Sequence, residues 1–133
     1  MIRLMPSAIR RGPAAVGDRL KPCWRWNNCV CSEEGAAPIH GIEPFAVQGD
    51  PEIVFARLKV LVAAMERTRV VDETDEYLHA VCRTLLRFGD DLEFRLCPTE
   101  GVIHVRSQAR IGVFDHHVNR QRVEALRRQL ASA

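Results

Sequence analysis

The segment from Leu92 to Arg122 reads LEFRLCPTEGVIHVRSQARIGVFDHHVNRQR, and its pattern decides the fold. Residues 92–96 and 102–111 each alternate between apolar and polar side chains, which is typical of β-strands with one buried face. The loop left between the strands, Pro98–Gly101, is of an acceptable kind for a hairpin. The segment therefore predicts two antiparallel strands, a polar loop and a final helix.

The register of this hairpin follows from which side chains must be buried together. The apolar side chains of both strands must share one face, because a slip of one residue turns them all to the other side. This requirement pairs Phe94 with Val105. The same register pairs Glu93 with Arg106 on the opposite face.

The predicted sheet therefore has one apolar face, which packs on helices, and one polar face. The polar face includes His79, Arg83, Glu93, Arg95, His104, Arg106, Gln108 and Arg110. One interpretation is a solvated face with a cross-strand ion pair, which is common in antiparallel sheets. The alternative is a polar floor that binds an anionic or carbonyl-bearing ligand.

The rest of the chain supplies the other elements. Asp50 and Pro51 are a strong helix start, and apolar residues at helical spacing continue it to about Glu66. Strands are predicted at 42–45, 68–72 and 77–86, and the last helix ends near residue 130. The predicted fold class is α+β: a single antiparallel sheet of about four to five strands covered by two helices, in the order β-α-β-β-β-β-α.

Length and charge limit the class of protein. The chain has 133 residues and 47% hydrophobic residues, as expected for one globular domain without a membrane-spanning helix. Residues 1–22 carry a net charge of +4, so we expect a disordered basic leader before a single domain at 23–133. The remainder is slightly acidic, which argues against nucleic-acid binding. The leader has no apolar core of a secretory signal, so a cytoplasmic location is expected.

Cys23, Cys29 and Cys31 lie within nine residues, with His40 shortly after. Their spacing is not that of paired zinc ligands, so they are only weak metal candidates and no metal or cofactor is expected. A disulfide from Cys23 to Cys29 or to Cys31 is possible in an oxidising compartment. Because no export signal is visible, reduced structural thiols are the default expectation.

The last loop and helix concentrate charge. Asn119 is a good N-cap residue, and Arg120 and Arg122 lie in the first helical turn, where cations oppose the helix dipole. Asp115 or Glu124 is expected to compensate these cations internally. The alternative is an anion bound at the helix N-terminus.

From about residue 23 to residue 130 the chain resembles domain-of-unknown-function family 1499. The resemblance lies in residues 28–30, Tyr77 and His79, 88–94, 105–112, Asp115 and 118–124. It departs from the family pattern at Cys31 and Ala109, where Ser is usual, and at His117, where Gly is usual. No activity is implied. The resemblance does imply one polar cluster that forms the candidate ligand site: Asp91, Glu93, Arg106, Ser107, Arg110, Asp115, Asn119 and Arg122.

Two classes of function follow. The first is a non-catalytic module that holds a small anionic ligand or a protein partner on its polar face or in the cleft beside the last helix. The second is a hydrolase-like enzyme with Cys29 as nucleophile and His79 or His104 as base, or with the Asp91 and Glu93 pair beside a histidine. A buried, mutually satisfied network would make the cluster structural, whereas a concave pocket of several hundred Å³ would indicate a ligand site.

Overall fold

The computed structural model describes residues 15–16, 19–23, 28–33, 38–84, 89–111, 115 and 117–132. Its elements are β1 (Ala15–Val16), β2 (Arg19–Leu20), β3 (Cys29–Cys31), β4 (Phe45–Ala46), α2 (Pro51–Ala63), β5 (Thr68–Glu73), β6 (Tyr77–Arg83), β7 (Gly89–Cys97), β8 (Val102–Ala109) and α3 (Val118–Ser132). Neither described helix is long and apolar enough to cross a membrane.

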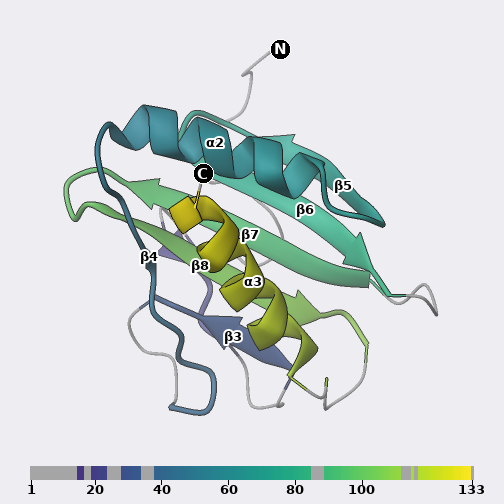
Figure 1. Cartoon of the computed structure of the whole chain (residues 1–133). Helices are drawn as coiled ribbons and strands as arrows, with labels where there is room; N and C mark the ends of the chain where they lie inside the picture. The colour runs from purple at the N-terminus through teal and green to yellow at the C-terminus, as the bar shows by residue number, and fades with distance from the viewer. Residues whose placement is uncertain are drawn as a thin grey trace.

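The main sheet is antiparallel, with strands in the order β3-β8-β7-β6-β5, and β4 also pairs with β8. Both helices lie on the same face of this sheet (Figure 1). The predicted α+β class, the two covering helices and the element order are therefore confirmed. β1 and β2 form a separate two-stranded sheet, which was not predicted.

The central hairpin has the predicted register. Phe94 pairs with Val105 and Glu93 pairs with Arg106 along β7 and β8. The loop between these strands contains Gly101, whose φ of 67° lies in the left-handed region where a side chain is disfavoured. The pattern of buried side chains thus sufficed to determine the pairing of the two longest strands.

The helix α2 starts where the sequence predicts. The Asp50 side chain accepts hydrogen bonds from the backbone N–H groups of Glu52 and Ile53, and Pro51 occupies the first turn. The helix ends at Ala63 rather than near Glu66, because the chain must turn back into β5. Arg67 takes part in that turn with a φ of 53°, which no helical residue adopts.

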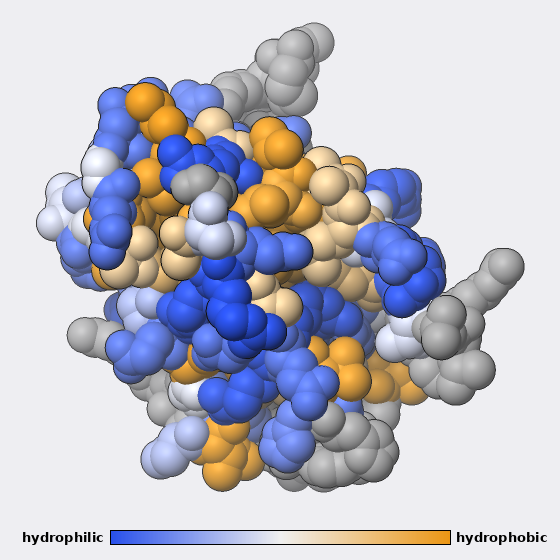
Figure 2. All heavy atoms as spheres, viewed as in Figure 1, coloured by the Kyte–Doolittle hydropathy of each residue, from blue (hydrophilic) through white to orange (hydrophobic). Residues whose placement is uncertain are grey.

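The hydrophobic core fills the space between the two helices and the sheet. Phe45 and Phe94 pack against each other with ring centroids 5.6 Å apart. Leu58 and Val62 of α2, and Val123 of α3, are completely buried in the same core. Figure 2 shows that hydrophilic side chains cover α3, whereas apolar side chains gather over α2.

The edge strands differ most from expectation. The predicted first strand at 42–45 is the short β4 at Phe45–Ala46, and β3 at Cys29–Cys31 was not predicted. Both strands pair along the same edge of β8. Most of the predicted leader lies outside the described residues; within its described part, Leu20 of β2 is 1% exposed. A leader ending at residue 22 stays a prediction.

Candidate functional site

The sheet separates the predicted polar residues into two clusters, because successive residues of a strand point to opposite faces. The inner cluster lies on the helix-covered face and consists of Asp90, Ser107, Asp115, Asn119 and Arg122. The outer cluster lies on the opposite face and consists of Tyr77, His79, Asp91, Glu93, Arg106 and Arg110. The predicted residues therefore do not converge on one site.

Arg122 is the centre of the inner cluster. Its Nη2 donates to Asp90 Oδ2 at 2.7 Å, and its Nη1 donates to Asn119 Oδ1 at 2.8 Å and Ser107 Oγ at 3.1 Å. Ser107 Oγ in turn donates to Asn119 Oδ1 at 2.5 Å. Asp90, which sequence reasoning missed, compensates Arg122 in place of the expected Asp115 or Glu124.

Asp115 has a different role, because it caps α3. Its Oδ2 accepts from the backbone N–H and the side-chain Nδ2 of Asn119, at 3.2 and 2.7 Å, and its Oδ1 accepts from the backbone N–H of His117. Asn119 itself lies inside the helix, so its prediction as the N-cap is wrong. The Asp115 carboxylate occupies the position at which a bound anion was considered.

His117 adopts a φ of 65° just before α3. This left-handed conformation costs a side-chain-bearing residue about 1–2 kcal/mol. Glycine adopts it freely, which gives a physical reason for the glycine usual in the resembling pattern. His117 thus keeps a backbone conformation suited to glycine, although histidine stands where glycine is usual.

Asp91 anchors one half of the outer cluster. Its Oδ1 lies 2.7 Å from His79 Nε2, and Arg110 donates to both carboxylate oxygens at 2.9 Å. Burial alone raises the pKa of a carboxyl group, but these hydrogen bonds and charges outweigh it and lower the pKa of Asp91 to about 2. Asp91 is therefore ionised at neutral pH.

Glu93 anchors the other half and is completely buried. Tyr77 donates its hydroxyl to Glu93 Oε2, whereas Arg106 Nη1 lies 3.7 Å from Glu93 Oε1. Burial raises the pKa of Glu93 in spite of these partners. Among the described residues, Glu93 Oε1 and Arg106 Nε are buried without a hydrogen-bond partner.

The middle of the polar face is buried, because His79, Glu93, His104 and Arg106 are all buried. The interpretation as a solvated face is wrong for these residues, whereas Arg83 and Arg110 are exposed. Glu33 accepts two hydrogen bonds from Arg95 at 2.7 and 3.0 Å and one from the backbone N–H of Leu20 at 3.0 Å. These bonds draw β2 and the segment after β3 onto this face. Long-range packing of the N-terminal part of the domain is the reason for the burial.

Two of the three clustered cysteines are joined: Cys23 and Cys29 form a disulfide, so reduced thiols are the wrong expectation for this pair. Cys31 is a free, buried thiol whose pKa is raised by burial. His40 Nδ1 lies 3.0 Å from the carbonyl oxygen of Cys29. Within the described part of the chain, no group of three or more potential ligands is arranged to hold a metal ion.

The disulfide also bears on the remaining expectations. Disulfides persist in oxidising compartments, so the pair is evidence against the expected cytoplasmic location, which stays a prediction. A nucleophilic Cys29 requires a free thiol, and the oxidised Cys29 has none. His79 is bonded to Asp91 and His104 Nδ1 lies 3.0 Å from Ser32 Oγ, so neither histidine is placed against Cys29 as a base.

A cavity lies elsewhere, in a groove between α2, β4 and α3. It has a volume of about 590 Å³. Its lining residues are Glu43, Pro44, Phe45, Ala46, Gln48, Val54, Arg57, Glu124, Arg127, Leu130 and Ala131. None of these belongs to the predicted site. Val54 and Leu130 are buried residues of α2 and α3, and no local signal in the sequence indicates that the two helices leave a groove between them.

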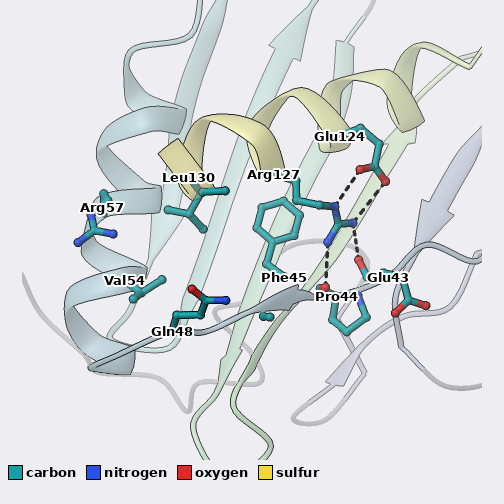
Figure 3. A pocket seen from close by; sticks show the side chains of 11 residues that line it. Glu43, Pro44, Phe45, Gln48, Val54, Arg57, Glu124, Arg127 and Leu130 are labelled. Atoms are coloured by element: carbon teal, nitrogen blue, oxygen red, sulfur yellow. Dashed lines mark hydrogen bonds and ion pairs between the residues drawn. The ribbon is translucent and has the colours of Figure 1, made fainter. Parts of the chain in front are cut away.

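One cation of the groove is fully engaged. Arg127 donates to Glu124 Oε1 at 2.8 Å and to the carbonyl oxygens of Pro44 and Glu43 at 2.9 and 2.6 Å. Its guanidinium also lies over the Phe45 ring at 4.7 Å (Figure 3). Arg127 thereby fastens α3 to the segment before β4 and keeps the groove in shape.

The other cation is unengaged. Arg57 projects from α2. Phe45 and Leu130 lie between Arg57 and Arg127 (Figure 3). Within the described residues its guanidinium makes no hydrogen bond or ion pair. A cation beside an apolar floor is an arrangement that recognises an anionic group attached to an apolar body.

A second cavity of about 410 Å³ lies near the start of α3. Its lining includes Asp115, His117 and Arg120. Asp115 is committed to capping, and Arg120 Nη2 donates to the carbonyl oxygen of Ile39 at 3.2 Å. These partners leave this cavity with less unengaged charge than the groove.

The comparison with family models agrees with the resemblance in the sequence pattern. Residues 19–130 match the family model described as protein of unknown function (DUF1499). Comparison with curated proteins finds no match to the chain. The family match covers most of the chain and includes both polar clusters and the groove-forming helices. The chain therefore belongs to the DUF1499 family of proteins of unknown function.

Proposed function

We propose that this protein is a non-catalytic binding module, and that its ligand is a small amphiphilic molecule held in the groove between α2, β4 and α3. The observation that carries the proposal is the concave groove of about 590 Å³, which combines an apolar floor with the unengaged cation of Arg57. Ligand pockets typically have this size and this mixture of apolar surface with a few polar groups.

The floor supports binding of an apolar body. Phe45, Val54 and Leu130 line the groove, yet each is at most 8% exposed, so they form a firm, mostly packed surface. Because these side chains expose little area, the apolar area removed from water on binding belongs mainly to the ligand, at a gain of about 25 cal/mol per Å². The exposed residues Ala46 and Ala131 at the margin leave room for a ligand to enter.

Arg57 supports recognition of an anionic group. Its side chain needs no internal partner to be broken before it meets a carboxylate, sulfonate or phosphate. Gln48 lies on the same side of the groove and offers an amide N–H (Figure 3). The small anionic ligand expected from the sequence is thus proposed for the cleft beside the last helix, rather than for the buried polar clusters.

The polar clusters support the proposal indirectly. The inner cluster joins β7 and β8 to α3 through Arg122, so it helps to hold the helix that forms one wall of the groove. Removing it is expected to destabilise the fold rather than to remove a ligand contact. We assign both clusters a structural role in this module.

The test is binding of 8-anilinonaphthalene-1-sulfonate, an apolar fluorophore with one anionic group. We expect saturable binding to the native protein, weakened about threefold by Arg57→Gln, since an exposed charge contributes up to about 1 kcal/mol. Arg69→Gln on β5, outside the groove, is the matched control and should bind like wild type.

A second matched pair tests the groove itself. Ala131→Trp fills the groove and should abolish binding, whereas Ser132→Trp, on the next residue of α3, should not. Circular dichroism must show native tertiary structure throughout, because the dye also binds partly unfolded states. Equal binding by the two tryptophan variants, or no saturable binding to wild type, would overturn the proposal.

A further inference from the structure

The two ends of the groove carry opposite charges that are both unengaged. Arg57 lies at the α2 end, and Glu43 lies at the other end, beyond Phe45 and Pro44 (Figure 3). Within the part of the chain that the structure describes, neither the Arg57 guanidinium nor the Glu43 carboxylate makes a hydrogen bond or an ion pair. Both residues are solvent-exposed.

The other two charges of the groove cancel each other. Arg127 Nε and Nη2 donate to the two carboxylate oxygens of Glu124 at 2.8 and 3.4 Å. A bound ion is not needed to balance either of them. The charges available to a ligand are therefore one positive group at one end and one negative group at the other, separated by the apolar floor.

We infer that the groove takes a zwitterionic ligand, with a carboxylate at Arg57, an ammonium group near Glu43 and an apolar body over Phe45 and Leu130. This inference rests on the proposed function and narrows its ligand class. A ligand with only an anionic group leaves Glu43 unmatched, and complementary charge at both ends favours one orientation of the ligand. Both ω-amino acids and short peptides of apolar residues have this chemistry.

The experiment is displacement of 8-anilinonaphthalene-1-sulfonate from the wild-type protein by a matched series. The competitors are octanoate, octylamine, 8-aminooctanoate, 12-aminododecanoate and trileucine. At least one zwitterion should displace the dye at about threefold lower concentration than octanoate, because it adds one partly exposed ion pair. Tighter displacement by trileucine indicates a peptide, and tighter displacement by an amino acid of the series indicates an ω-amino acid.

Variants separate the two charges. Glu43→Gln should remove the advantage of the zwitterion and leave octanoate unchanged, whereas Arg57→Gln should weaken octanoate and zwitterion alike. Glu66→Gln, an exposed carboxylate outside the groove, is the matched control.

The two proposals fail in different ways. One outcome is that the dye binds saturably while octanoate or octylamine displaces it at concentrations as low as any zwitterion requires. That result overturns the zwitterion inference and leaves the proposed binding function of the groove unaffected. The same holds if Glu43→Gln leaves the zwitterion advantage intact. If the dye does not bind the native protein at all, the proposed function itself is overturned.

Discussion

Two ion pairs on opposite faces of the same sheet, Asp90–Arg122 and Glu93–Arg106, are buried in different ways. On the helix-covered face, Arg122 donates hydrogen bonds to Asp90, Asn119 and Ser107 at ordinary distances. On the opposite face, Arg106 lies 3.7 Å from Glu93. Among the described residues, one buried atom of each partner there lacks a hydrogen-bond partner.

This difference shows that buried ion pairs contribute unequally to stability, depending on whether their hydrogen bonds are satisfied. A pair with satisfied hydrogen bonds fixes a helix on a sheet, and removal of one partner leaves an isolated buried charge. A pair without direct hydrogen bonds gains less from its charges, and the raised pKa of Glu93 shows that burial outweighs its partners. The Asp90–Arg122 and Glu93–Arg106 pairs should therefore respond differently to the same type of substitution.

The largest effect is expected from Arg122→Met. It leaves Asp90, only 3% exposed, without its cationic partner, and breaking such a pair costs about 3–5 kcal/mol of unfolding free energy. The measurement is urea unfolding at neutral pH. Arg128→Met, an exposed arginine on the same helix, should change stability by less than about 0.5 kcal/mol. Similar values for the two variants would contradict the role given to the inner cluster.

The second-largest effect is expected from Asp91→Asn, whose loss of stability should depend on pH. Because the pKa of Asp91 is lowered to about 2 in the folded protein, its ionised form stabilises the fold above the unfolded pKa of about 4. That stability is lost as pH falls through about 2. The variant should be about 2 kcal/mol less stable than wild type at pH 7, and the two curves should converge towards pH 2.

The control for this titration is Glu66→Gln, which removes an exposed carboxylate outside both clusters. At pH 7 this control should lose less stability relative to wild type than Asp91→Asn does, because Glu66 is exposed. A constant difference between Asp91→Asn and wild type from pH 7 to pH 2 would show that the bonds to His79 and Arg110 do not depend on the charge of Asp91.

The smallest effect is expected from Arg106→Met, about 1–2 kcal/mol at neutral pH. Glu93, left without its cation, can bind a proton, because burial already raises its pKa. A raised pKa gives stability that is present at low pH and lost as pH rises through the folded pKa. The variant should therefore lose more stability at pH 8 than at pH 5.

A double variant sharpens this prediction. Adding Glu93→Gln to Arg106→Met removes the titrating group, so the extra loss of stability at high pH should disappear. A loss from Arg106→Met as large as that from Arg122→Met would show that the two ion pairs do not differ in the way described.

The register of β7 and β8 was predictable because it depends on local alternation. Phe94 and Val105 must be buried together, and a hairpin has few ways to satisfy that requirement. The start of α2 was predictable for the same reason, since Asp50 bonds to N–H groups only two and three residues away.

The composition of each polar cluster was not predictable to the same degree. Asp90 and Asp91 are neighbours in the sequence, yet one bonds Arg122 and the other bonds Arg110 on opposite sides of the sheet. The family resemblance indicated which residues belong together in a pattern, but it does not state on which face each one lies.

The amino-acid sequence alone was enough to predict the order of the elements, the pairing of the central strands and the family. The order and the pairing follow from periodicity, which acts between near neighbours. Tertiary structure alone decided the burial of the middle of the outer face, which depends on Glu33 meeting Arg95 across 62 positions of sequence. It also decided the groove, where Arg127 fastens α3 to Pro44 across 83 positions. Contacts at such separations arise from how whole elements pack, and no local pattern encodes them.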